Sequence, residues 1–256
     1  MRFRRLVCAA VLLMLVACQP GHAGQPRPLG DATQVIVVTT SGWDAVTGTL
    51  RRFERANAHS RWMAVGQPVE VVVGKNGLGW GSGISAADSA KIRAAGDPVK
   101  KEGDGKAPAG VFRLSKAFGY AAEGQSGWKM PYVGLSPSIV CVDDTGSKFY
   151  NRVLDRGTVT PDWNSSEHML PSDELYRWGI IVDHNADPPA AGSGSCIFMH
   201  IWRGPAQGTV GCTAMPRPEV ESLLGWLDPR RTPLLVQLPK GEYKKLESRW
   251  KLPRLK

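Results

Sequence analysis

Short apolar runs, each bounded by turn residues, recur along most of the chain. Five clear examples are QVIVVTT (34–40), SIVCVDD (138–144), WGIIVDHN (178–185), CIFMHIW (196–202) and TPLLVQLP (232–239). Apolar runs of this length that end at Gly, Pro, Asn or Asp are typical of strands. The pattern therefore predicts a mainly β fold, a sandwich or barrel with a few short helices.

Two segments have a helical spacing instead. Between residues 43 and 57 apolar positions recur at intervals of three and four, with charged residues between them; these positions are Trp43, Val46, Leu50 and Phe53. This spacing predicts an amphipathic helix. A second helix is predicted over residues 217–227, with Pro216 and Pro218 near its start.

Between these segments a strand and a glycine-rich stretch follow one another. In VGQPVEVVVG (65–74) the apolar residues Val69, Val71 and Val73 alternate, which predicts a half-buried strand. The next stretch, GKNGLGWGSGIS (74–85), contains five glycines and predicts a loop or a hairpin tip.

The first residues have the pattern of an export signal. A basic start with three arginines precedes an apolar run at 6–17 that is too short to span a bilayer comfortably. The run ends in LVAC, which resembles the lipobox of bacterial lipoproteins. This resemblance implies removal of residues 1–17 and diacylation of Cys18. An ordinary secretory signal followed by a chance cysteine is the alternative.

A lipid on Cys18 would hold the protein on a membrane, at the periplasmic face of the cell envelope. Gln19 follows the cysteine, and by resemblance to Gram-negative sorting this favours the outer membrane. Residues 18–33 are rich in Pro and Gly and predict a flexible tether.

The net charge of the chain indicates which class of partner it can bind. The formal net charge is +9, and removal of residues 1–17 takes away three arginines and no acid, which leaves +6. A moderately basic exported protein suits an anionic cell-wall partner. The chain has no basic run with interleaved aromatics, so we do not expect nucleic acid as a partner. Its oligomeric state is left open.

With Cys8 in the signal and Cys18 lipidated, three cysteines remain, Cys141, Cys196 and Cys212. In an oxidising compartment an odd number suggests one disulfide and one free thiol, which is then a candidate for reactivity. The chain has no CxxC pair and no Cys/His spacing of the zinc type, so we expect neither a metal nor a cofactor.

The stretch CIFMHIWRGPAQGTVGC holds the candidate chemistry. Alternate residues of a strand face opposite sides, so His200 lies on the face opposite the core-facing Ile197, Met199 and Ile201. The turn RGPAQG then brings Cys212 back toward His200. A neighbouring base raises the thiolate fraction of a cysteine. On spacing alone, a structural cysteine and a core histidine are the commoner explanation.

His200 followed by TVGC (209–212) resembles the signature of the YkuD-type L,D-transpeptidases, in which Ser/Thr-His-Gly-Cys follows an earlier histidine. GDGKAPAGVF (103–112) resembles the family segment G…TPxGxF that precedes a strand. The resemblance covers residues 34–238 and leaves 239–256 as a basic C-terminal tail. It implies a mainly β catalytic domain that remodels bacterial peptidoglycan.

Carried over from the family, Cys212 is the nucleophile and His200 is the general base and later the acid. Cys212 would attack the carbonyl of the third stem-peptide residue, a diamino acid, and expel the terminal D-alanine as a thioester forms. An amine of a second stem would resolve the thioester into a 3→3 cross-link. Gly211 and Thr209 would support the turn, whose backbone N–H groups would hold the oxyanion.

The chain departs from the family pattern at two positions. Val210 stands where the family has its second histidine, and Ala214 stands where Arg or Asn is usual. The interval from His200 to Cys212 is also shorter than in the better-known members. These departures leave the acceptor open, because water would give an L,D-carboxypeptidase and a protein acceptor would give an attachment reaction. A non-catalytic wall-binding lipoprotein is the other alternative.

Five further residues are candidates near this site. Cys141 and Cys196 lie in predicted strands, and a disulfide between them would leave the nucleophile reduced; two buried thiols are the alternative. Trp202 and Arg203 directly follow the base and are candidates for substrate binding, Arg203 through a carboxylate. His184, at a strand end, is either a further binding residue or a solvated turn residue.

Overall fold

The structure is a computed structural model that describes residues 27–255. The expected export signal and the lipidated Cys18 lie outside these residues. The strands are β1 (Gln34–Thr40), β2 (Thr47–Glu54), β3 (Met63–Val72), β4 (Leu78–Trp80), β5 (Ala107–Gly119), β6 (Tyr132–Gly134), β7 (Ile139–Cys141), β8 (Val153–Asp155), β9 (Glu167–His168), β10 (Trp178–Val182), β11 (Phe198–Ile201), β12 (Thr213–Met215) and β13 (Leu234–Pro239). The helices are α1 (Ala86–Ile92), α2 (Arg217–Trp226) and α3 (Lys240–Trp250), with short 3-10 turns η1 (Arg156–Thr158) and η2 (Pro229–Arg231).

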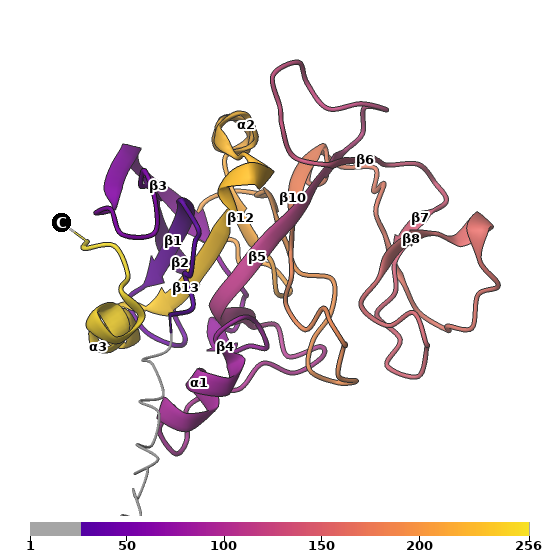
Figure 1. Ribbon diagram of the computed structural model, residues 1–256. Coiled ribbons are helices and arrows are strands. Elements are labelled where there is room, and N and C mark those ends of the chain that lie inside the picture. The colour runs from indigo at the N-terminus through magenta and orange to yellow at the C-terminus, as the bar shows by residue number, and fades with distance from the viewer. Residues whose placement is uncertain (1–26, 256) are drawn as a thin grey trace, which may run out of the picture.

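Eight strands close into a barrel in the order β5, β10, β11, β12, β3, β2, β1 and β13, with β13 pairing back onto β5 (Figure 1). β4 and β6 pair with β5 outside this ring, and β7, β8 and β9 form a separate three-stranded sheet. The shortest pairing in the barrel is between β12 and β3, where only Ala214 and Val72 pair. The predicted mainly β fold with a few short helices is confirmed.

The apolar run QVIVVTT forms β1, whose seven residues are all buried. β1 lies between β2 and β13, and its register with β13 is parallel. Strands covered on both faces have continuous rather than alternating apolar sequences, which explains this run. The predicted helix over 217–227 is confirmed as α2, whose Val220, Leu223 and Leu224 pack into the main core.

The helix predicted over residues 43–57 is wrong, because this segment contains β2. Leu50 pairs with Val38 and Phe53 with Val35 of β1, so the two apolar residues lie on opposite faces of the strand. Both faces are covered, and both side chains are buried. The interval of three therefore reflects burial on two sides rather than one stripe of a helix, and tertiary pairing decides between the two.

The glycine-rich stretch 74–85 is not simply a loop tip, because it contains the buried strand β4, which pairs in parallel with β5. Its glycines permit close backbone approach. Gly77 has φ +77°, and a Cβ there would lie 2.0 Å from the carbonyl oxygen of Trp43.

The folded part extends beyond both predicted boundaries. At the start, Leu29 and Ala32 of the expected tether are buried. At the end, the expected tail forms α3, which packs its apolar side against β1 and β13 and buries Tyr243, Leu246 and Trp250. Within residues 27–255, no helix is long and apolar enough to cross a membrane.

Candidate active site

Two adjacent parallel strands, β11 and β12, bring the candidate nucleophile and base to one face. His200 pairs with Ala214, which places Cys212 opposite Phe198. The backbone N–H of Phe198 donates to Cys212 Sγ at 3.3 Å, in agreement with this register. Because alternate strand residues share a face, Cys212, Phe198 and His200 lie on the same side.

The predicted alternation along this strand is confirmed. Ile197, Met199 and Ile201 belong to the main core, whereas Cys196 and Phe198 belong to a second buried cluster on the other side. This second cluster also contains Cys212 and lies between the barrel and the β7–β8–β9 sheet.

The turn before Cys212 is closed by Thr209. Its hydroxyl donates to the carbonyl oxygen of Cys212 at 2.6 Å and accepts from the N–H of Gly211 at 3.1 Å. A Cβ on Gly211 would lie 3.4 Å from the carbonyl oxygen of Lys106, within the GDGKAPAGVF segment. The two motif segments therefore meet in the fold. Val210, between Thr209 and Gly211 in this turn, is 73% exposed.

Cys212 is a neutral thiol in the resting protein. It is 4% exposed, and burial raises its pKa above the usual range, with the negative charge of Glu167 adding to the effect. The N–H of Phe198 and the charge of Lys100 act in the opposite direction but are weaker. The expected activation of the thiolate by a neighbouring base is therefore not found in the resting state.

His200 is also neutral, and its hydrogen bond selects one tautomer. Nδ1 lies 2.7 Å from the carbonyl oxygen of Ile201, so Nδ1 carries the proton and Nε2 carries the lone pair. The residue is 6% exposed, and burial lowers its pKa to about 4. Within the described residues His200 and Cys212 share no hydrogen bond; the Cys212 thiol instead donates to the Cys196 carbonyl oxygen at 3.6 Å.

Sequence patterns missed Tyr176 and Glu167. The ring of Tyr176 packs edge-on against His200, with the centroids 5.1 Å apart, and its hydroxyl donates to the Glu167 carboxylate. Burial raises the pKa of Glu167 to about 7, with a smaller contribution from Asp143. Tyr176 is in the same buried cluster as Cys212. No periodicity marks either residue, since both belong to irregular or very short elements.

Lys100 is a third residue that the sequence did not reveal. Its side chain is buried, and Nζ donates to Asp104 Oδ1 at 2.6 Å. Its Cε would lie 3.9 Å from a Cβ on Gly211, so its charge is close to the turn before Cys212. The GDGKAPAGVF resemblance did mark the segment that contains Asp104.

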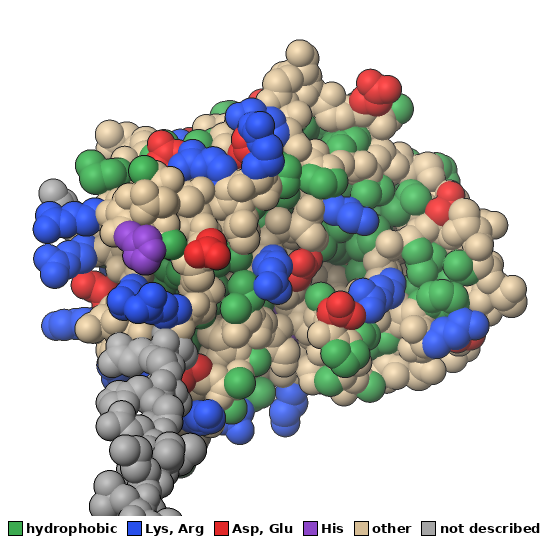
Figure 2. Space-filling view, viewed as in Figure 1, with side chains coloured by type: hydrophobic (Ala, Val, Ile, Leu, Met, Phe, Trp, Pro, Cys, Tyr) green, Lys and Arg blue, Asp and Glu red, His purple; other side chains and the backbone are tan. Residues whose placement is uncertain are grey.

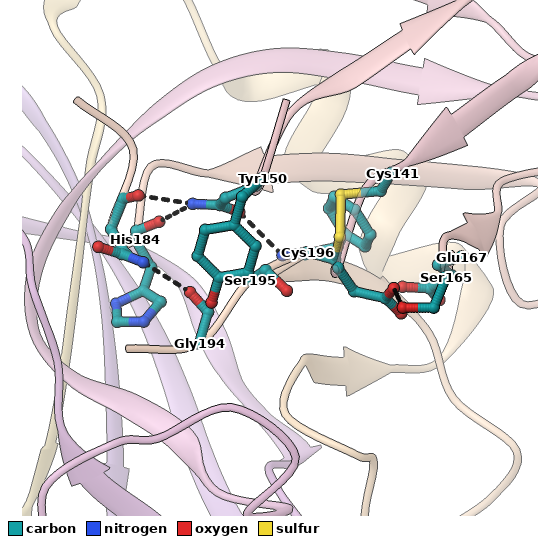
Figure 3. Close-up of a disulfide and its surroundings, with 12 residues drawn as sticks. Cys141, Tyr150, Ser165, Glu167, His184, Gly194, Ser195 and Cys196 are labelled. Atoms are coloured by element: carbon teal, nitrogen blue, oxygen red, sulfur yellow. Dashed lines mark hydrogen bonds between the residues drawn. A yellow bond between two sulfur atoms is a disulfide. The ribbon is translucent and has the colours of Figure 1, made fainter. Parts of the chain in front are cut away.

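Cys141 and Cys196 form a disulfide (Figure 3). Cys212 is free. The disulfide joins β7 to the residues just before β11, across 55 positions of sequence. The N–H of Cys196 also donates to Asn151 Oδ1 at 2.9 Å, so this segment is held by a covalent and a hydrogen bond. In the β7–β9 pairing Glu167 lies opposite Cys141. The disulfide thus joins the β7–β8–β9 sheet to the barrel within the second cluster.

The other candidate binding residues occupy different positions. His184 is buried, with Nε2 2.9 Å from the Ser193 carbonyl oxygen and Nδ1 accepting from the Ser82 N–H at 3.3 Å. Burial lowers its pKa to about 4. Its ring ties two loops together and is not among the side chains around Cys212.

Trp202 and Arg203 lie just beyond His200. Trp202 is half-buried, and its backbone N–H donates to the Met215 carbonyl oxygen at 2.9 Å. Arg203 is exposed and donates to Asp173 Oδ2 at 3.1 Å. Within residues 27–255, no cluster of His, Cys, Asp and Glu side chains could hold a metal ion.

Comparison with protein families shows the family of the chain. A model of the YkuD L,D-transpeptidase catalytic domain matches residues 54–236. The chain belongs to this family. Family membership makes the barrel an L,D-transpeptidase-type domain with peptidoglycan as its substrate. Searches of curated proteins and of solved structures found no match.

Proposed function

We propose that the chain is a peptidoglycan L,D-transpeptidase that acts through a thioester on Cys212. The observation that carries this proposal is the arrangement of Cys212 and His200 on one face of β11 and β12. The Nδ1 bond to Ile201 leaves the lone pair of Nε2 available as a base.

Both groups are neutral at rest, so the proton moves during attack. As Cys212 Sγ bonds to the carbonyl carbon of the third stem residue, His200 Nε2 takes the thiol proton. The tetrahedral intermediate then collapses, and His200 returns the proton to the departing nitrogen of D-alanine. Catalytic hydrogen bonds that are long in a free enzyme commonly shorten when substrate binds.

The oxyanion requires a donor beside the nucleophile. The N–H of Gly211 already donates to the Thr209 hydroxyl. We therefore assign the oxyanion contact to the N–H of Cys212, whose own carbonyl is fixed by Thr209.

The thioester is resolved by an amine of a second stem, which loses its proton to His200 and restores the thiol. This produces a 3→3 cross-link. Water in place of the amine would yield a tripeptide and make the enzyme an L,D-carboxypeptidase. Protein attachment is a further possible outcome of the same thioester.

The test is incubation of the detergent-solubilised full chain with a disaccharide tetrapeptide that contains diaminopimelate. We expect a mass increase on Cys212 in wild type and in neither Cys212→Ala nor His200→Gln. Product analysis then separates the acceptors, since a cross-linked dimer supports transpeptidation and a tripeptide alone supports hydrolysis. An unmodified Cys212 together with unchanged muropeptides would refute the thioester mechanism.

We also propose that the protein is exported and anchored through a lipid on Cys18. The support is the LVAC sequence after a short apolar run. Cells grown with labelled palmitate should label the wild-type chain and not Cys18→Ala; equal labelling of both would refute the anchor.

A further inference from the structure

A cavity of about 250 Å³ opens on the same face as Cys212, next to the disulfide. Its lining includes Ile181, Asp183, Phe198 and, from β5, Ser115 and Lys116. Figure 2 shows the surface hollowed right of centre, between the barrel and the β7–β8 region, with hydrophobic side chains inside and charged side chains beside it.

Strand registers place the cavity beside the nucleophile. Ile181 of β10 pairs with Phe198 of β11, whose N–H contacts Cys212 Sγ, so these three residues form one row across the sheet. Asp183 lies two residues farther along the chain from Ile181, on the same face. The Cα atoms of Asp183 and Cys212 are separated by two strand spacings across the sheet and by two residues along it. This gives a distance of about 12 Å.

Asp183 is a carboxylate that forms no ion pair within the described residues. It is half-buried, its Oδ1 accepts from the Ser115 hydroxyl at 2.6 Å, and no ion pair within 4 Å involves it in the described part of the chain. Its pKa is raised by burial, against the weaker effects of the Ser115 hydrogen bond and of the charges of Arg113 and Lys116. A carboxylate that has lost part of its hydration gains most from a cationic ligand.

Positive charge lies at the rim of the same cavity. Lys116 is exposed and, within residues 27–255, has no ion pair. Arg152 also lines the cavity, and its guanidinium lies 3.6 Å from Asp187, which is 89% exposed. The cavity therefore presents an acid inside and bases at its edge.

We propose that this cavity binds a donor side chain that ends in an α-amino acid, with an ammonium and a carboxylate on one carbon, as in diaminopimelate. Asp183 pairs with the ammonium and Lys116 with the carboxylate. This assignment rests on the proposed function, because it takes the third stem residue as the acyl donor. It makes Asp183 and Lys116 the residues that select the donor by the charges of its side chain.

The dimensions suit this ligand. Six bonds separate the attacked carbonyl carbon from the terminal ammonium nitrogen, a reach of roughly 7 Å. Together with the side chains of Cys212 and Asp183, this reach spans the interval between the two residues. The volume of the cavity equals that of roughly eight liquid waters, which is enough for the charged end of one such side chain.

The test uses full-length Cys212→Ala protein in detergent, so that binding is measured without chemistry. Calorimetry would give the Kd of three tetrapeptides, with diaminopimelate, lysine, or diaminopimelate acetylated on its distal amine at position three. Asp183→Asn should weaken the first two about tenfold and leave the acetylated peptide unchanged. Lys116→Met should weaken both diaminopimelate peptides and leave the lysine peptide unchanged.

Glu70→Gln, which removes an exposed charge on β3, is the matched control and should change none of the three. The assignment would be overturned if either cavity variant weakened the binding of all three peptides equally. It would also be overturned if neither variant weakened the binding of any peptide. Thioester formation by the wild type is measured separately. A thioester without charge preference rejects the cavity alone, whereas charge-selective binding without a thioester rejects the proposed function alone.

Discussion

Cys212 and His200 are both uncharged in the free protein, and burial is the main cause in each case. A buried neutral thiol reacts slowly with small alkylating reagents even in an active enzyme. A low alkylation rate would therefore not distinguish a non-catalytic relative from a transpeptidase. In the proposed mechanism the charges arise only when attack on a carbonyl creates an oxyanion that the N–H donor can stabilise.

Burial is the main reason that the pKa of Cys212 is raised, and the negative charge of Glu167 adds to it. The pKa of Glu167 is raised to about 7, so it is mainly ionised above pH 7, where its charge opposes a thiolate. Glu167→Gln keeps an acceptor for Tyr176 and removes the charge. We expect alkylation of Cys212 by iodoacetamide to become about tenfold faster at pH 8.5 and to stay unchanged at pH 5.5.

The control for this measurement is Glu123→Gln, which removes an exposed charge between β5 and β6. If Glu167→Gln accelerated alkylation equally at both pH values, its effect would come from opening the site and not from removing a charge.

At the scale of elements, the disulfide fixes the small β7–β8–β9 sheet to the segment that leads into β11. In the chain-entropy treatment a bond across 55 residues stabilises the fold by about 4 kcal/mol. The double variant Cys141→Ser with Cys196→Ser should lose about this much unfolding free energy in urea. Wild type in reductant should approach the variant, and the variant itself should not respond to reductant. A variant as stable as oxidised wild type would contradict this expectation.

α3 is part of the core rather than a tail. Trp250 is fully buried, and its indole N–H donates to Asp88 Oδ2 at 2.6 Å. Trp250→Ala should lower the unfolding free energy by about 3 to 5 kcal/mol. Lys244→Ala, at an exposed position of the same helix, should change it by less than about 0.5 kcal/mol. Equal effects of the two substitutions would show that α3 does not stabilise the barrel.

For the whole molecule, buried titratable groups set the dependence of stability on pH. His184 and His200 both have pKa values lowered to about 4, so between pH 6.5 and 4 the unfolded chain binds more protons. Stability present at neutral pH is therefore lost as the pH falls through this window, on the order of 3 kcal/mol for each histidine. Glu167 acts oppositely, because its raised pKa makes the folded state bind the extra proton between pH 4.5 and 7.

The expected net result is a lower unfolding free energy at pH 4.5 than at pH 7.5, measured in urea. Glu167→Gln removes the opposing contribution and should make the loss steeper, whereas His200→Gln should make it smaller. Equal stability of the wild type at the two pH values would contradict the lowered pKa values of His184 and His200.

Much of the fold and part of the site could be predicted from the sequence. The alternation in CIFMHIW assigned the faces of β11 correctly because it depends only on the local strand period. The same approach failed at β2, where Leu50 and Phe53 are buried on opposite faces. It also missed α3 as a core element, since the charged residues of KGEYKKLESRW conceal three buried positions.

The sequence by itself determined the strand pattern, the likeness of residues 200–212 to a family signature, and the short list of cysteines. These are local properties, since they depend on side-chain order within one segment. Only the tertiary structure decided which groups surround Cys212: Tyr176, Glu167 and Lys100 come from separate segments that fold against the β11–β12 face. It also decided the charge states and the cavity at Asp183, because burial and distance exist only once the barrel has closed.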